Sequence, residues 1–433
     1  MPQFLSATDP DFEARFAALL AMKREDSPDV DAVVAGIIAD VRARGDQAVI
    51  DLTAKFDRQS LTPATLRFSE AEIDTAIATV SPEDRAALEL AADRIRAYHH
   101  RQKPEDTQWQ DASGATLGWR WTPVSAAGLY VPGGLAAYPS SVLMNAIPAK
   151  VAGVERLAVT VPTPDSKFNA LVLLACRIAG VDEIYRIGGA QAIAALAYGT
   201  DTIAPVDKIT GPGNAFVAAA KRRVFGKVGI DMIAGPSEIL VIADEANDPD
   251  WIALDLMSQA EHDESAQALL ITTSESFGQK VAAAVDKRLE TLERRAIAAA
   301  SWRDFGAVIT VPDLDAAATL ANRIAAEHLE LCVPDPEALA AKIPHAGAIF
   351  LGAFTPEAIG DYVGGPNHVL PTARSARFSS GLSVMDFVKR TTMAKMTPDA
   401  LRAIGPAAET LAKAESLEAH GLSVRARLDA LNR

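Results

Sequence analysis

Arg156-Leu-Ala-Val-Thr-Val161 begins the part of the sequence that is most diagnostic of the fold, because short β-branched runs alternate with helical patterns from this point onward. A helical pattern through Cys176 comes next, followed by a second run at Asp182–Ile187 and a second helical pattern through Ala197. This alternation is typical of strand–helix–strand units that build a parallel sheet. The stretch therefore predicts an α/β domain.

The same alternation returns after Pro236. Apolar runs that predict strands and periodic runs that predict helices again follow one another. The expected strands are Glu238–Ala243, Ala268–Thr272, Ala307–Val311 and Leu329–Val333, and the expected helices are Asp250–Ala260, Phe277–Leu292 and Leu314–Ala326. We therefore expect two α/β domains in tandem.

The two ends of the chain show a helical pattern instead. Residues 31–57 and 81–101 carry apolar positions three and four apart, and from about Gly381 the pattern is helical again up to a charged tail. We expect a mainly helical region at 1–125, a first α/β domain at 126–236, a second at 237–380 and a helical tail at 381–433.

Composition and charge narrow the class of protein. The 433 residues include 42 basic and 56 acidic side chains, a net charge of −14 that argues against nucleic acid or an anionic membrane as partner. Only two cysteines occur, and no apolar stretch approaches the roughly 18 residues that a membrane span needs. A soluble cytoplasmic protein that acts on small molecules is expected.

Gln259-Ala-Glu-His262 places a carboxamide and an imidazole one helical turn apart near the end of an expected helix. Asp361 and His368 border a Gly/Pro-rich loop and add a carboxylate and a second imidazole. Together these donors suit a borderline cation such as Zn²⁺ at an open, catalytic position. A hydrogen-bonded Gln–His pair and an ordinary turn are the alternatives.

Glu327 and His328 stand side by side at the boundary between an expected helix and an expected strand, a place where open α/β sheets present catalytic groups. An adjacent acid and imidazole can carry out general acid–base chemistry with two proton acceptors of different pKa. A surface glutamate beside a packed histidine is the alternative.

His99 and His100 lie in a polar run, which predicts a solvated helix end.

Two glycine-rich turns, Tyr130-Val-Pro-Gly-Gly134 and Thr210-Gly-Pro-Gly-Asn214, can expose backbone N–H groups to an anion such as a phosphate. Neither is a G-x-G-x-x-G sequence, so they indicate a nucleotide cofactor only weakly, and turn geometry alone also explains the glycines. Cys176 and Cys332 lie in apolar runs and are expected to be packed thiols rather than nucleophiles.

Taken together, these stretches resemble the histidinol dehydrogenase family over essentially the whole chain. The resemblance is carried by long and unusual sequences that include the two glycine-rich turns and the Gln259–His262 stretch. They are Tyr130-Val-Pro-Gly-Gly134, Tyr138–Ala149, Ile209–Phe216, Asp231-Met-Ile-Ala-Gly-Pro-Ser-Glu238, Ser258-Gln-Ala-Glu-His262, Glu327-His-Leu-Glu330 and Gly365-Pro-Asn-His-Val-Leu-Pro371.

The resemblance implies a zinc-containing, NAD-dependent enzyme that oxidises L-histidinol to L-histidine through an enzyme-held aldehyde, in the last step of histidine biosynthesis. It implies Glu327 and His328 as the acid–base pair, and the following binding residues. The metal ligands are Gln259, His262, Asp361 and His420, the NAD contacts are Tyr130, Gln191 and Asn214, and the substrate contacts are Ser237, His328, His368 and Glu415 together with the metal ligands.

The resemblance also implies an architecture. The family's fold has two incomplete Rossmann-like domains with helical additions, assembled as a homodimer with one zinc ion per subunit. Its C-terminal tail reaches into the partner's site, which would explain why Glu415 and His420 lie far from the other site residues in sequence.

Three rival functions remain open at this point. A related enzyme acting on another polar alcohol, such as a sulfonated or amino diol, would be expected to show additional arginine or lysine near the site. A zinc-stabilised nucleotide-binding module without turnover would not need the Glu327–His328 pair. A metal-dependent hydrolase would work without NAD.

Overall fold

The computed structural model describes residues 2–22, 28–132, 138–233 and 235–433. The chain divides into two compact units, Met1–Gln102 with Ser125–Phe387, and Lys103–Val124 with Val388–Arg433. The first unit contains two parallel sheets with many helices, so the α/β class is confirmed. No helix in the described ranges combines the length and hydropathy needed to cross a membrane.

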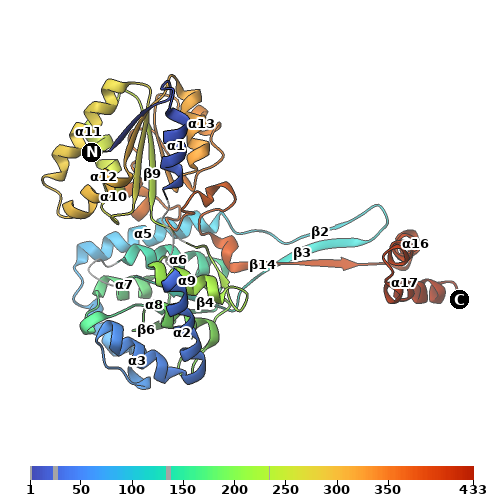
Figure 1. The fold of residues 1–433 in the computed structure, drawn as a ribbon. Helices are drawn as coiled ribbons and strands as arrows, with labels where there is room; N and C mark the ends of the chain where they lie inside the picture. Colours follow the sequence, from blue (N-terminus) through green and yellow to red (C-terminus); the bar gives the residue numbers. More distant parts are fainter. Residues whose placement is uncertain (1, 23–27, 133–137, 234) are drawn as a thin grey trace. The chain divides into compact units, whose positions relative to one another are not determined.

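The first parallel sheet has five strands in the order β6-β5-β4-β7-β8, and every neighbouring pair is parallel. Two groups of helices surround it, α4 to α7 and α2, α3, α8 and α9 (Figure 1). The strands are β4 (Ala126–Tyr130), β5 (Arg156–Thr160), β6 (Glu183–Tyr185), β7 (Lys208–Thr210) and β8 (Gly229–Ile230). The helices are α2 (Pro28–Arg44), α3 (Asp46–Asp57), α4 (Glu70–Ile77), α5 (Pro82–His100), α6 (Pro139–Ala152), α7 (Ala170–Ala179), α8 (Gly189–Tyr198) and α9 (Ala215–Val224).

The second parallel sheet has six strands in the order β1-β11-β10-β9-β12-β13. Its strands are β1 (Gln3–Ser6), β9 (Glu238–Ala243), β10 (Gln267–Thr272), β11 (Ala307–Thr310), β12 (His328–Cys332) and β13 (Ala348–Leu351). Its helices are α1 (Phe12–Ala21), α10 (Pro249–Ala260), α11 (Glu275–Leu289), α12 (Arg295–Phe305), α13 (Leu314–Ile324), α14 (Pro336–Ala340) and α15 (Glu357–Tyr362).

The second sheet is covered on both faces, because successive side chains of a strand point in opposite directions. In β9, Ile239 and Val241 pack in the cluster formed with α10, α11 and α12, whereas Leu240 and Ile242 pack in the cluster formed with α1 and α13. All four side chains are at most 1% exposed, and burial of each contributes about 1.5–3 kcal/mol. This explains the uninterrupted apolar run in the sequence.

The N-terminal region, expected to be mainly helical, also contributes a strand. Residues Gln3–Ser6 form an edge strand that pairs in parallel with β11, roughly 300 residues away in sequence. The following helices α2 to α5 pack with the helices of the first sheet. The first hundred residues therefore add an edge strand to the second sheet and helices to the layers around the first.

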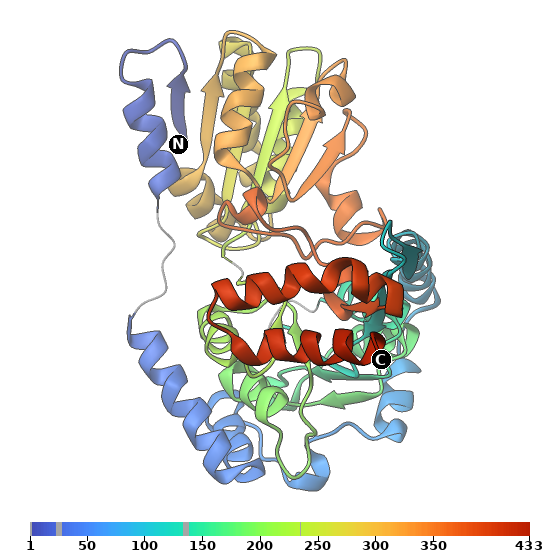
Figure 2. The same cartoon turned by 90° about the vertical axis from the view of Figure 1, so that its right-hand side faces the viewer.

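The second unit is a three-stranded antiparallel sheet followed by two helices. The sequence pattern had indicated a mainly helical region for its first segment and a helical tail for its second. Its strands, in the order β14-β3-β2, are β2 (Thr107–Gln110), β3 (Thr116–Pro123) and β14 (Val388–Lys395). Helices α16 (Pro398–Ala414) and α17 (Glu418–Leu431) pack side by side (Figure 2). Gly405 permits this close approach, since a Cβ there would lie 3.2 Å from side-chain atoms of Val424 and Leu428.

Candidate active site

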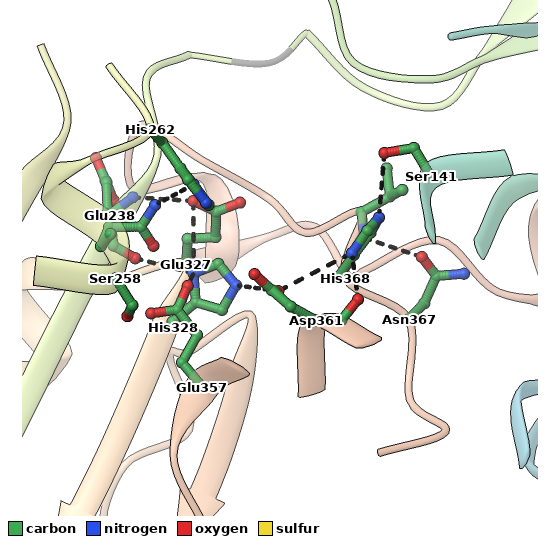
Figure 3. A network of polar contacts seen from close by, with 12 residues as sticks. Ser141, Glu238, Ser258, His262, Glu327, His328, Glu357, Asp361, Asn367 and His368 are labelled. Atoms are coloured by element: carbon green, nitrogen blue, oxygen red, sulfur yellow. Dashed lines mark hydrogen bonds and ion pairs between the residues drawn. The ribbon is translucent and has the colours of Figure 1, made fainter. Parts of the chain in front are cut away.

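One backbone position orients both expected acid–base groups. Glu238, the first residue of β9, donates its backbone N–H to Glu327 Oε2 at 2.9 Å. The carbonyl oxygen of Glu238 lies 3.1 Å from His328 Nδ1 (Figure 3). Both side chains are buried, with 5% and 4% exposure. The parallel pairing of β9 with β12 therefore fixes the glutamate and the imidazole next to each other.

The contact with Glu238 also decides the proton positions on His328. A carbonyl oxygen accepts hydrogen bonds, so Nδ1 carries the hydrogen and Nε2 has the lone pair. Nε2 is buried without a hydrogen bond from any described residue and lies 3.9 Å from Asp361 Oδ1. Burial lowers the pKa of His328 to about 4, although the Asp361 carboxylate opposes that effect. The neutral imidazole can thus accept a proton at Nε2.

Asp361, at the end of α15, lies between two imidazoles (Figure 3). Its Oδ1 is 3.9 Å from His328 Nε2 and 3.9 Å from His368 Nδ1, and its backbone carbonyl accepts the His368 Nδ1 hydrogen at 3.0 Å. On the other side of the ring, His368 Nε2 lies 3.5 Å from Ser141 Oγ. Burial lowers the pKa of His368. The structure therefore brings together three of the expected site residues, His328, Asp361 and His368.

Glu357 is a further buried carboxylate at this site, which no sequence pattern had singled out. This side chain is 1% exposed, and its Oε1 lies 3.4 Å from His328 Nδ1. Burial, together with the nearby Asp361 and Glu330 carboxylates, raises the pKa of Glu357 well above its usual range. Ligand atoms of His328, Glu357 and Asp361 lie within 4.8 Å of one another, close enough for a cation to bridge. Its spacing of four residues from Asp361, one turn of helix, was the signal available in the sequence.

Gln259 lies in the last turn of α10 and His262 follows two residues after its last residue, so both are near the helix end, as expected. Asp248 caps the helix by accepting the N–H of Asp250 at 2.9 Å, with Pro249 in the first turn. Gln259 Nε2 lies 3.1 Å from His262 Nδ1, and Gln259 Oε1 is buried without a hydrogen bond from any described group. A buried oxygen with an unused acceptor site fits a role as metal ligand, because burial without a partner is costly.

The three residues expected to contact NAD lie at the carboxyl ends of strands in the first sheet, or just after them. Tyr130 ends β4, and its hydroxyl accepts the N–H of Gly189 at 3.1 Å; burial raises the pKa of Tyr130 to about 12. Gln191 lies in the first turn of α8, and Asn214 caps α9 by accepting the N–H groups of Phe216 and Val217. Gly133 and Gly134 of the first glycine-rich turn lie outside the described residues.

The remaining expected contacts occupy two different places. Ser237 immediately precedes Glu238, and its carbonyl accepts the N–H of Gln267 at 3.0 Å. Glu415 and His420 belong to the second unit, where Glu415 follows α16 and His420 lies in α17. Both of these side chains are exposed.

Two expectations about histidines need correction. His99 is not solvated but fully buried, with Nδ1 2.8 Å from the carbonyl of Ile95 and Nε2 3.4 Å from Asn367 Nδ2. The Glu327–His328 pair stands at an element boundary as expected, but at the amino end of β12, whereas ligand sites of open α/β sheets usually lie at carboxyl ends. Cys176 and Cys332 are buried free thiols, as predicted.

Known proteins resemble this chain over its full length. The sequence model of the family described as histidinol dehydrogenase matches residues 20–428. The histidinol dehydrogenase of Ruegeria pomeroyi is 80% identical over 432 residues, 100% of each chain, and that of Rhodospirillum rubrum is 66% identical over 99% of each chain. The crystal structure of histidinol dehydrogenase from Elizabethkingia anophelis superposes with a TM-score of 0.95 at 37% identity, covering 100% of this chain and 99% of that one. This chain therefore belongs to the histidinol dehydrogenase family.

Proposed function

We propose that this protein is a cytoplasmic enzyme of histidine biosynthesis that oxidises L-histidinol to L-histidine with NAD, through an enzyme-held aldehyde. The observation that carries the proposal is the buried Glu327–His328 pair, held by the backbone of Glu238 beside Asp361 and His368. The choice of L-histidinol as substrate follows from the names of the relatives. The Glu327–His328 pair provides the acid–base groups that an alcohol oxidation needs.

The order of strands supports NAD as the cofactor. Numbered along the chain, the strands of the first sheet run 3-2-1-4-5, and β9 to β13 repeat this order in the second. This is the order of Rossmann-like dinucleotide-binding sheets, in which ligands bind where the order reverses. Tyr130 ends β4 and Asn214 follows β7, and these are the two strands at that reversal. In our proposal residues 126–236 bind NAD, which accepts the hydride. Gln191 is the third NAD contact, beside Tyr130 and Asn214.

The donor set supports zinc as the metal. We assign Gln259, His262, Asp361 and His420 as its ligands, a mixture of nitrogen and oxygen donors without the cysteine cluster of a structural zinc site. The unsatisfied Gln259 Oε1 fits this role. Bound there, zinc would act mainly as a template that holds the substrate's amine and imidazole, with one ion per subunit. The domain at 237–380 then carries three of the four ligands.

His328 serves as the base of the first oxidation in this proposal. An alcohol gives up its proton poorly near neutral pH, so hydride transfer needs an acceptor beside the hydroxyl. The lone pair on Nε2 is available because Nδ1 is committed to the Glu238 carbonyl. The buried setting of the ring excludes competing hydrogen bonds from water.

Glu327 serves mainly in the second oxidation. The aldehyde must add water before it can lose a second hydride, and a carboxylate can take a proton from that water. Glu238 fixes one oxygen of Glu327 through its backbone N–H, which orients the group without neutralising it. His328 then accepts the proton of the hydrate. Retaining the aldehyde prevents its reaction with cellular amines.

The tail provides the remaining substrate and metal contacts from a second subunit. Helix α17 has no buried residue, and of the 17 residues of α16 only Ala400, Gly405 and Ala412 are buried. Large apolar side chains on these helices, including Leu411 at 63% and Leu422 at 57% exposure, support a partner surface. We propose a homodimer in which the tail at 381–433 brings Glu415 and His420 to the partner's Ser237, His368 and zinc ligands.

Purified protein is expected to form NADH from L-histidinol, to lose this activity after removal of metal by a chelator, and to regain it when zinc is restored. Activity should fall because the template for the substrate disappears while the Glu327–His328 pair remains. NADH absorbance and metal content measured on the same samples give the result.

Each rival function predicts a different pattern in this assay. Turnover without NAD would indicate a hydrolase, and NAD binding without turnover would indicate a non-catalytic module. Faster NADH formation from a sulfonated or amino diol than from L-histidinol would move the proposal to that substrate. Unchanged activity in metal-free protein would contradict the role of zinc.

Co-expression of a His328→Asn chain with a His420→Ala chain is expected to restore activity that neither variant has alone. If the tail acts in the partner's site, a mixed dimer contains one site with both replacements and one with neither. The measurement is NADH formation by dimers purified through two different affinity tags. Mixed dimers no more active than either parent would show that each tail serves its own subunit.

A further inference from the structure

The glycine-rich turn that follows β7 is held very closely against β4. Gly211 has φ +114°, a backbone conformation that residues with a side chain rarely adopt. A Cβ on Gly211 would also lie 2.1 Å from the backbone oxygen of Tyr130. The turn runs on through Gly213 to Asn214, the N-cap of α9. Small shifts of Gly211 therefore change the positions of both Tyr130 and Asn214.

Two buried charged residues hold Gly211 from both sides. Lys221, in the second turn of α9, donates from Nζ to the carbonyl of Gly211 at 2.9 Å. Asp231, directly after β8, accepts the N–H of Gly211 on Oδ2 at 2.8 Å. Lys221 Nζ and Asp231 Oδ1 also form an ion pair, in which the side chains are only 3% and 1% exposed.

Stability alone is a weak reason for such a pair. Burying two charges costs more free energy than their attraction usually returns, and apolar side chains of similar volume often serve the fold equally well. The pair instead fixes the orientation of the turn. The Lys221 ammonium donates to the carbonyl of Gly211, and the Asp231 carboxylate accepts the N–H of the same residue. The turn is thereby fixed in a backbone conformation that only glycine adopts readily.

We propose that Lys221 and Asp231 are positioning residues for the nucleotide. They act through Gly211, on the turn that carries Asn214 and lies close against the backbone of Tyr130. The inference rests on the proposed function in one respect, that Tyr130 and Asn214 contact NAD. The new element is that the affinity for NAD depends on the buried Lys221–Asp231 ion pair, which holds the turn in place.

The test uses the full-length protein with the double replacement Lys221→Met and Asp231→Asn. Replacing both partners avoids leaving one buried charge unpaired. The matched control is Arg223→Met with Asp31→Asn, which removes another ion pair of α9, an exposed one whose Arg223 Nε lies 2.8 Å from Asp31 Oδ1. NAD binding by calorimetry is measured without substrate, followed by KM for NAD, KM for L-histidinol and kcat.

The double variant is expected to bind NAD roughly 10- to 100-fold more weakly, because the hydrogen-bonding groups at Tyr130 and Asn214 are no longer aligned with the nucleotide. In the double variant, KM for L-histidinol and zinc content should stay within about twofold of wild type. The control variant should change neither the NAD affinity nor KM for L-histidinol. A purely structural role would instead lower the melting temperature and leave the NAD affinity of the folded fraction intact, which would overturn the proposal.

Two further outcomes are separable. If the wild type binds no NAD, the proposed function fails, whereas wild-type binding with equal binding by the double variant refutes only the positioning role. If the double variant does not fold, Asp231→Glu replaces it, because this variant keeps the charge and displaces the carboxylate by one methylene. The same selective loss of NAD affinity is expected, and unchanged affinity in Asp231→Glu would then count against the proposal.

Discussion

Replacing His328 by asparagine is expected to slow both oxidations of L-histidinol by roughly 10²- to 10⁴-fold, the range that a positioned general base contributes. The asparagine amide can still donate to the carbonyl of Glu238, as Nδ1 does now, but it offers no basic nitrogen at the Nε2 position. The measurement is kcat with L-histidinol and, separately, with the aldehyde supplied as substrate.

His100→Asn is the matched control, because His100 is exposed at the end of α5 and does not belong to the site. It should retain wild-type kcat with both substrates. If His328→Asn oxidised the aldehyde at the wild-type rate, His328 would not be the base of the second step. If it lost zinc as well as activity, the loss could not be assigned to proton transfer.

Glu327→Gln is expected to separate the two oxidations. Conversion of the aldehyde to the acid should fall by roughly 10²- to 10⁴-fold, because a carboxamide cannot take a proton from water. The side-chain oxygen of glutamine can still accept the N–H of Glu238, so the local geometry is preserved. Alcohol oxidation should fall much less, and the aldehyde should accumulate; single-turnover kinetics with each substrate measures both steps.

Glu275→Gln makes the same chemical change at an exposed position of α11 and should leave both rates unchanged. Zinc content of Glu327→Gln should equal that of wild type, since Glu327 is not among the proposed ligands. Equal losses in the two steps would contradict the division of work between Glu327 and His328.

The central strands of the second sheet were predictable because burial on both faces leaves an unmistakable sequence pattern. Expected Glu238–Ala243 coincides with β9, and expected Ala307–Val311 differs from β11 by one residue. The strand β14 was missed because it is exposed along most of its length, so its sequence Val-Lys-Arg-Thr-Thr-Met-Ala-Lys carries no apolar run. β1 was missed because its partner β11 is distant in sequence.

The candidate site was predictable in part for similar reasons. Gln259 and His262 could be paired from helical spacing, and Glu327 and His328 from adjacency. Glu357 went unnoticed because a glutamate in a short helix looks solvated in the sequence, and its burial beside His328 of β12 becomes visible only in the folded chain. His99 was misjudged because its burial depends on Asn367, 268 residues away.

The α/β class, the central strands and the chemical types available to the site could be predicted from the residues alone, because periodicity, caps and donor atoms are local properties. Which of these groups meet depends on the folding of the whole chain. The Nδ1 hydrogen of His328 depends on the carbonyl of Glu238 in a neighbouring strand, and the hold on Gly211 depends on charges ten and twenty residues further along the chain. Protonation, burial and position arise from contacts between distant segments, which no local pattern encodes.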